Sequence, residues 1–223
     1  MSERIKSDLR REETSLLASS PSKTAVARAA ILEAAKEFLE AHPFRDLTVG
    51  KLMQSTQYSR PTFYQHFNDL HSLMEALLDG VKGGIIEGAQ PWLTGDGDPV
   101  ENLRASLRGL VEIGFQHGTI LKAVADAASN DARLELVWES FLSAFDEVVA
   151  ARITEEQTKG LTPDFDPFPV ARALNRMDAA LLINQFGQGQ KGSKDDTLSA
   201  LVRIWLSTLY PISGEGLIKQ KQP

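Results

Sequence analysis

The chain has 223 residues, of which 42% are hydrophobic and 24% charged, as in an ordinary globular protein with one large domain or two small ones. It contains no cysteine, which excludes disulfides and thiolate metal sites. No apolar run approaches the ~18 residues of a membrane-spanning helix, and the polar N-terminus lacks a secretory signal, so we expect a cytoplasmic protein with no membrane partner.

The net charge of −6 is unevenly distributed along the chain. Residues 1–66 carry 10 basic and 8 acidic side chains (+2), whereas residues 67–223 carry 14 and 22 (−8). A slightly basic head on an acidic body is compatible with a head that meets a polyanion. An ordinary solvated surface explains so modest an asymmetry about as well.

The first 22 residues are polar and are expected to form a flexible arm. Helical spacing of apolar side chains begins near Thr24 and stops before Pro43. The first helix is therefore expected between these two points, with an apolar stripe of Ile31, Leu32, Ala35, Phe38 and Leu39.

Two short helices are expected next. Thr48 is placed to cap a helix that runs from Val49 to about Ser55. Ser59 is placed to cap a third helix, and Pro61 falls in its first turn, where a missing N–H group costs nothing.

Longer helices follow. Asn68 is placed to cap a fourth helix, which is expected to fray or bend near Gly83-Gly84. Asp98 opens a fifth helix that extends to about Gln116, and a short sixth is expected over residues 120–128.

The last three expected helices run from Asn130 to about Gln157, from Val170 to Phe186 and from Asp195 to Tyr210. Ser193 is placed to cap the ninth helix. Residues 187–192 fit the pattern G-x-G-x-x-G, but no strand precedes them, so a turn is expected and not a dinucleotide site. No alternating strand pattern is present, and the predicted fold class is all-α.

Three short helices before a long one are typical of a helix-turn-helix, whose third helix enters the major groove of DNA. On a helix that begins after Ser59, Phe63 and Phe67 share one face and are expected in the core. The other faces offer groups that pair with phosphates and bases, from Arg60, Thr62, Tyr64, Gln65 and His66. A helix whose polar residues face only water explains the spacing about equally well.

The segment TVGKLMQSTQYSRPTFYQHFNDLHSLMEALL, residues 48–78, resembles the DNA-binding domain of TetR-family transcriptional repressors. The body resembles the ethionamide-regulating branch of that family, through ALNxM at residues 173–177 and DTLxxLVxIWxxxxY at residues 196–210. The resemblance implies a three-helix domain over residues 23–68 and a six-helix ligand-binding and dimerisation domain over residues 69–223. It implies that a double-stranded DNA operator is contacted by Thr48, Arg60, Thr62, Tyr64 and His66, and we expect Lys51, Ser59 and Gln65 to contact it as well.

Two residues depart from the family pattern. Gln57 stands where the family has a left-handed glycine in the turn, which is expected to cost roughly 1 kcal/mol. Leu70 stands where the family has a lysine on a phosphate, so one backbone contact is expected to be lost and the salt dependence of DNA binding to weaken.

The resemblance also implies an elongated apolar cavity for a small hydrophobic effector. The expected ligand-binding residues are Arg104, Phe115, Trp138, Phe141, Leu142, Phe145, Asn175, Asp178, Leu182 and Trp205. A buried amide must find a partner, and the asparagine that matches Asn175 binds the ligand in the resembling repressors. Arg104 and Asp178 replace a Trp and an Asn of the family, and we hypothesise that they pair near the cavity, because lone buried charges are costly.

The last two expected helices have wide apolar coverage, from Leu174, Met177, Leu181, Phe186, Leu198, Leu201, Ile204 and Leu209. Pairing with a second copy through these helices would give a homodimer whose recognition helices lie about 34–36 Å apart. We therefore expect a dimeric repressor that binds a palindromic operator and is released by a small, largely apolar ligand, with no enzymatic activity, cofactor or metal. The alternatives are a ligand-independent activator or architectural protein, and an all-α small-molecule carrier.

Overall fold

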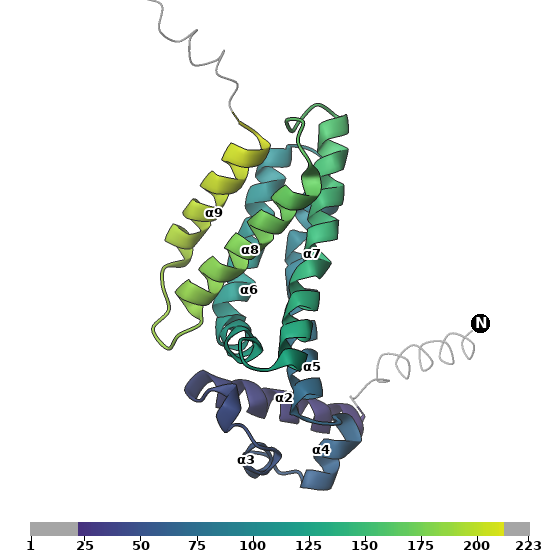
Figure 1. Ribbon diagram of the computed structural model, residues 1–223, viewed down its shortest axis with the longest axis vertical. Helices are drawn as coiled ribbons and strands as arrows, with labels where there is room; N and C mark the ends of the chain where they lie inside the picture. The colour runs from purple at the N-terminus through teal and green to yellow at the C-terminus, as the bar shows by residue number, and fades with distance from the viewer. Residues whose placement is uncertain (1–21, 212–223) are drawn as a thin grey trace, which may run out of the picture.

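The structure is a computed structural model that describes residues 22–211, and every regular element in that range is helical (Figure 1). The expected arm lies outside the described residues except for Ser22. The all-α prediction is confirmed by α2 (Lys23–Ala41), the 3-10 turn η1 (Phe44–Asp46), α3 (Val49–Gln54), α4 (Arg60–His66), α5 (Leu70–Thr94), α6 (Pro99–Ala128), α7 (Ala132–Thr158), α8 (Pro167–Phe186) and α9 (Lys194–Leu209). Across residues 22–211, no helix is both long and apolar enough to span a bilayer.

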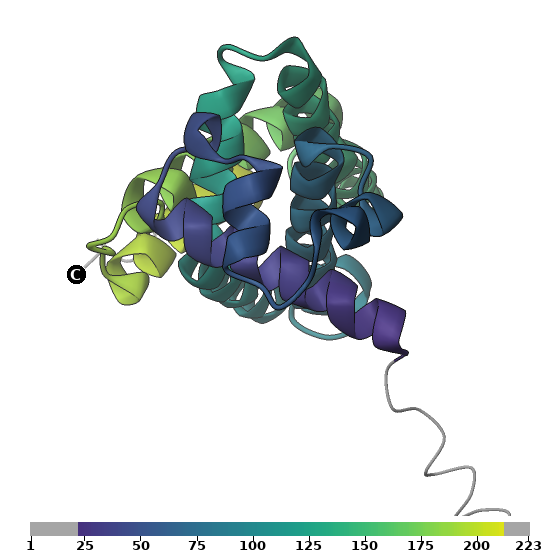
Figure 2. The same cartoon turned by 90° about the horizontal axis from the view of Figure 1, so that it is seen from below.

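The helices α2, α3 and α4 form a small group at one end of a taller body built from α5 to α9 (Figures 1 and 2). Phe63 and Phe67 are 0% and 4% exposed, which confirms their predicted place in the core. They share one hydrophobic cluster with Ile31, Leu39 and Leu52, and with the first turns of α5.

Most of the predicted caps are present. The Thr48 hydroxyl accepts a hydrogen bond from the Lys51 backbone N–H at 3.1 Å, and the Ser193 hydroxyl caps α9 through the Asp196 N–H. Ser59 occupies the N-cap position of α4 but makes no capping hydrogen bond with its side chain. Asp69, and not Asn68, caps α5, which corrects that assignment.

Helix α5 stays helical through Gly83-Gly84 as far as Thr94, so the predicted interruption is wrong. The reason is that some of its glycines allow close packing against α6 and do not make the helix flexible. A Cβ atom on Gly84 would lie 2.9 Å from the Ile113 side chain, and one on Gly109 would lie 3.0 Å from the Gly88 Cα. Glycine therefore lets α5 and α6 approach closely, which a sequence pattern cannot distinguish from a helix break.

Helix α6 is one continuous element where two were predicted. Its buried residues continue past Gly118 with Ile120, Leu121 and Val124. A Cβ on Gly118 would lie 2.5 Å from the Phe186 carbonyl oxygen, so this glycine admits the end of α8. The segment between the two predicted helices, which contains Gly118, is thus a helical packing contact with α8.

The last three helices lie close to the predicted ranges. Asp131, one residue after the expected Asn130, caps α7, and α8 begins at Pro167 instead of Val170. The glycine-rich residues 187–192 follow a helix and form the turn between α8 and α9, which agrees with the prediction of a turn.

Two contacts between acidic and basic side chains join the start of α5 to the turn between α6 and α7. Asp69 caps α5 and also accepts a hydrogen bond from Arg133 Nη1 at 2.7 Å. Asp131 caps α7, and its carboxylate lies 2.7 Å from His71 Nε2. We call these four residues the α5–α7 clasp. The Arg133 hydrogen bond and the Ser72 N–H lower the pKa of Asp69 to about 2, and His71 lowers the pKa of Asp131.

The glycine contact between α6 and α8 predicts opposite effects for two glycine-to-alanine changes. Gly118→Ala should lower the free energy of unfolding by about 1–3 kcal/mol, because the new Cβ meets backbone that cannot move aside. Gly83→Ala should raise it by about 0.5–1 kcal/mol, because that helix position has open space around it. Urea denaturation at one fixed protein concentration measures both, and equal effects would contradict this account of α6.

The clasp predicts a pH dependence of stability. The folded-state pKa of Asp69 lies below its ordinary value of 3.8, so its contribution is complete above that value and is lost as the pH falls through about 2. Asp69→Asn keeps a capping oxygen but loses the charge. Urea midpoints should favour the wild type at neutral pH, and the gap should shrink below about pH 4. A gap that widens on acidification would refute the assigned ion pair.

Candidate DNA-reading surface and ligand cavity

The short helix α4 lies at the end of the molecule opposite the loop between α7 and α8 (Figure 1). Arg60, Tyr64 and Gln65 are exposed, with Tyr64 at 59%, while Thr62 and His66 are half-buried. Phe63 points into the core beneath them. The predicted α4 residues are therefore accessible in whole or in part, while Phe63 of the same helix is buried.

Local hydrogen bonds orient several of these side chains. The Ser59 and Thr62 hydroxyls lie 3.1 Å apart, and Lys51 Nζ donates to the Asp46 carbonyl at 2.9 Å. Thr48 is exposed, and the hydroxyl that caps α3 still has a proton to donate to an outside acceptor such as a phosphate. All eight predicted DNA-contact residues thus lie on α3, α4 or the positions that cap them.

The turn before α4 does not contain the strained residue that was expected. Gln57 has a negative φ, because no non-glycine residue between 22 and 211 has a positive one. The Thr56 hydroxyl makes the turn instead, since it donates to the Met53 carbonyl at 3.1 Å and accepts from the Tyr58 N–H at 3.2 Å. The predicted strain at Gln57 is therefore wrong.

The other departure from the family pattern has a packing role. Leu70 begins α5 and is partly buried against the hydrophobic cluster of the small helices. The substitution of a family lysine by Leu70 therefore adds apolar contact at the junction between α4 and α5.

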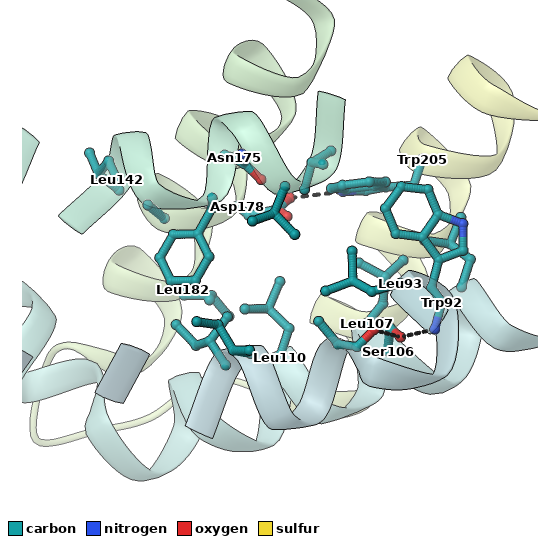
Figure 3. Close-up of a pocket in the computed structure, with 18 of the residues that line it drawn as sticks. Trp92, Leu93, Ser106, Leu107, Leu110, Leu142, Asn175, Asp178, Leu182 and Trp205 are labelled. Carbon is teal, nitrogen blue, oxygen red and sulfur yellow. Dashed lines mark hydrogen bonds between the residues drawn. The ribbon is translucent and has the colours of Figure 1, made fainter. Parts of the chain in front are cut away.

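The body contains an apolar cavity between α5, α6, α7, α8 and α9 (Figure 3). Its side chains with hydrogen-bonding groups are Ser106, Asn175, Asp178 and the two indoles, and the rest are aliphatic or phenyl groups. The lining residues are Ile85, Ile86, Ala89, Trp92, Leu93, Leu103, Ser106, Leu107, Leu110, Leu121, Phe141, Leu142, Phe145, Val148, Val149, Asn175, Asp178, Ala179, Leu182 and Trp205.

Seven of the ten predicted ligand residues line this cavity: Phe141, Leu142, Phe145, Asn175, Asp178, Leu182 and Trp205. Three do not. Trp138 stacks on Phe141 at a centroid distance of 5.4 Å, and Phe115 packs against Phe186. Arg104 lies on the outer side of α6, where its side chain is 44% exposed.

The hypothesised pair of Arg104 and Asp178 does not form. Arg104 contacts Glu101, one turn earlier on its own helix, at 3.6 Å. Asp178 is only 5% exposed, and its Oδ1 accepts a hydrogen bond from Trp205 Nε1 at 3.1 Å. Burial raises the pKa of the Asp178 carboxyl to about 7, and the indole hydrogen bond offsets this only in part.

Asn175 lies one turn before Asp178 and already has a protein partner for its amide nitrogen. Its Nδ2 donates to Asp146 Oδ1 at 2.9 Å, and the same oxygen lies 3.3 Å from Arg176 Nη1. The side-chain carbonyl oxygen of Asn175 has no hydrogen-bond partner among residues 22–211, so one hydrogen-bond acceptor remains beside the cavity.

The sequence prediction missed the cavity wall supplied by α5. Because the helix was expected to fray or bend near Gly83-Gly84, no helix face was assigned to Ile85, Ile86, Ala89, Trp92 and Leu93. The last four of these residues follow Ile85 by one, four, seven and eight positions, which is the spacing of a single helix face. This pattern in the sequence could have predicted that the helix continues. Ser106 was also missed; its hydroxyl accepts the Trp92 N–H at 2.9 Å and donates to the Ala89 carbonyl.

Most of the apolar residues predicted for the dimer interface are buried or partly buried within the monomer. Leu174, Phe186, Leu201 and Leu209 are buried in the core of the body, and Met177, Leu181 and Leu198 are partly buried. Ile204 is 40% exposed and faces outward from α9. The outer face of these two helices also carries exposed small residues, namely Ala173, Ala180, Ser199 and Ala200.

Two profiles of known families match separate parts of the chain. Residues 31–77 match the profile "Bacterial regulatory proteins, tetR family", and residues 103–211 match "Transcriptional regulator EthR, C-terminal domain". The chain is 28% identical over 188 residues to the HTH-type transcriptional regulator EthR of Mycolicibacterium smegmatis, covering 82% of this chain and 85% of that one. It is 29% identical over 185 residues to EthR of Mycobacterium tuberculosis H37Rv, covering 81% and 86%.

Solved structures share the fold at lower identity. A TetR-family regulator from Syntrophomonas wolfei aligns with a TM-score of 0.72 at 16% identity, covering 81% of this chain and 93% of that one. Salmonella enterica GusR aligns with a TM-score of 0.71 at 18% identity, covering 86% and 99%. The family and the curated relatives are transcriptional regulators and not enzymes. This chain belongs to the TetR family of transcriptional regulators and carries a C-terminal ligand-binding domain of the EthR type.

Proposed function

We propose that the protein is a dimeric, cytoplasmic repressor that binds a palindromic operator and releases it when a small, largely apolar ligand enters the body. The observation that carries the proposal is the cavity itself, lined almost wholly by apolar side chains. A ligand-independent activator would have no need of such a space, because a filled core is more stable than a hollow one. The polar face of α4 supplies the DNA-binding half of the proposal.

Helix α5 supports a direct route between the two sites. Its first turns pack in the core of the small helices, and its later residues from Ile85 to Leu93 line the cavity. Only three residues separate the end of α4 from the start of α5. A ligand that shifts α5 would therefore move α4, and it favours the DNA-incompetent state by binding that state better.

The α5–α7 clasp supports a second route between the cavity and α5. Asp69 and His71 on the side of α5 are held by Arg133 and Asp131 at the start of α7. Because α7 also lines the cavity through Phe141 and Phe145, a change in its position is transmitted to the N-terminal end of α5. The clasp thus couples the cavity wall to the element that carries the reading helix.

The outer face of α8 and α9 supports a two-fold dimer. In Figure 1, α9 forms one edge of the body with α8 beside it. Exposed Ile204 and small residues on this face would let the helices of two copies approach closely. A dimer of this kind would bind two half-sites at a spacing of about 34–36 Å.

The reading surface predicts a selective loss of DNA binding. After selection of an operator from genomic fragments, Tyr64→Ala should weaken binding roughly tenfold or more, because one anchoring side chain of each half-site is removed. Glu147→Ala, an exposed position on α7, is the control and should bind as the wild type does. Fluorescence anisotropy at one fixed salt concentration measures both affinities, and equal losses would contradict the assigned surface.

The dimer face predicts a second loss, by a different route. Ile204→Asp should give a monomer in sedimentation velocity runs and lower operator affinity roughly tenfold or more, because a monomer reads one half-site. Leu136→Asp is the matched control, since Leu136 is 72% exposed on α7, away from this face. A dimeric Ile204→Asp protein, or a monomeric Leu136→Asp protein, would place the interface elsewhere.

A further inference from the structure

Three carboxylates are buried in the body, and one of them has no cation beside it. Asp146 contacts Arg176 at 3.3 Å, and Glu156 contacts Arg152 at 3.0 Å. Asp178 is also buried, at 5% exposed, yet its one hydrogen-bond partner among residues 22–211 is the neutral indole N–H of Trp205. A buried carboxylate is ordinarily paired, because removing it from water without a counter-charge is costly.

Among residues 22–211, the surroundings of Asp178 offer no cationic side chain to fill this role. No lysine, arginine or histidine lines the cavity, and Asp178 is the one titratable residue among its lining residues. The arginines on the surrounding helices are paired elsewhere or exposed. Arg104 of α6 pairs with Glu101, Arg133 of α7 with Asp69, Arg152 of α7 with Glu155 and Glu156, and Arg176 of α8 with Glu139 and Asp146. Arg108 of α6, Arg172 of α8 and Arg203 of α9 are exposed. On α5, neither Asp79 nor Lys82 lines the cavity.

The second oxygen of Asp178 is the one left for a ligand. Figure 3 shows the Asp178 side chain at the cavity, with one of its oxygens joined to Trp205 by the dashed hydrogen bond. No side-chain nitrogen or oxygen that is fully shielded from solvent lacks a partner in the described chain, so the free oxygen is not sealed in protein. The edge-to-face pair of Trp92 and Trp205, with ring centroids 5.7 Å apart, borders the same space.

We propose that the ligand is an apolar amine, whose hydrocarbon part fills the cavity and whose protonated nitrogen pairs with the Asp178 carboxylate. This inference rests on the proposed function and specifies the chemical class of its effector. An ammonium group supplies both the missing charge and hydrogen-bond donors, and the neighbouring indole rings attract a cation as well. A fatty acid carboxylate would instead face a like charge with no cation to receive it.

The test compares three probes that share one chain: decylamine, decanol and decanoic acid. Quenching of tryptophan fluorescence reports binding, because Trp92 and Trp205 line the cavity. At about pH 8, where the carboxyl is ionised, the wild type should bind decylamine roughly tenfold or more tightly than decanol. A wild type that binds decanol or decanoic acid as well as decylamine overturns the proposal.

Two variants locate the effect at Asp178. Asp178→Asn keeps an acceptor for the Trp205 N–H but removes the charge, and it should bind decylamine and decanol equally. Arg104→Gln is the control, since it removes a cation from the outer side of α6 and not from the cavity, and the preference for the amine should persist. An amine preference that survives in Asp178→Asn refutes the assigned pair.

A pH series on the wild type tests the same ion pair without a variant, in case Asp178→Asn fails to fold. Between about pH 5.5 and 8, decylamine affinity should rise roughly tenfold or more as Asp178 loses its proton, while decanol affinity stays level. A level amine affinity would overturn the proposal.

Operator binding, measured separately, distinguishes this inference from the proposed function. Amine-selective binding that leaves operator affinity unchanged supports the site and contradicts ligand-induced release.

Discussion

The organisation of this regulator depends on α5 remaining one continuous helix from Leu70 to Thr94. The same rod is part of the core beneath the reading helix and of the wall around the cavity, so neither site is structurally independent of the other. Two features keep it in place. Glycine contacts allow α6 to lie against it, and the α5–α7 clasp holds its first turn. A long helix is a suitable connecting element, because it moves as a unit instead of deforming along its length.

Much of the fold could be predicted from periodicity and capping. The apolar spacing in α2, the cap at Thr48 and the cap at Ser193 were sufficient to place their helices, because these signals are local. The glycines were the main source of error. In the sequence, Gly84 and Gly118 cannot be distinguished from glycines that break a helix. Their role in packing depends on which residues of the neighbouring helix contact them. That information belongs to the tertiary structure and is absent from any short window of sequence.

The two candidate sites could be predicted from the sequence to different extents. The buried and accessible residues of α4 could be predicted from the sequence, because they lie within one short segment whose buried side was identified by Phe63 and Phe67. The cavity draws on five helices, and the expected contact of Arg104 with Asp178 required knowing which side of α6 faces inward. The replacement of two family pocket residues by opposite charges suggested a pair, yet the two residues occupy different environments, one at the surface and one inside.

The isolated carboxyl in the cavity has a consequence for how such regulators diversify. Aspartate and asparagine codons differ by a single nucleotide, and the two side chains have nearly the same shape. One point mutation at position 178 would therefore switch the interior between an acidic and a neutral lining without disturbing the packing around it. Regulators descended from a common ancestor could in this way acquire different chemical signals while keeping the same architecture and the same DNA target.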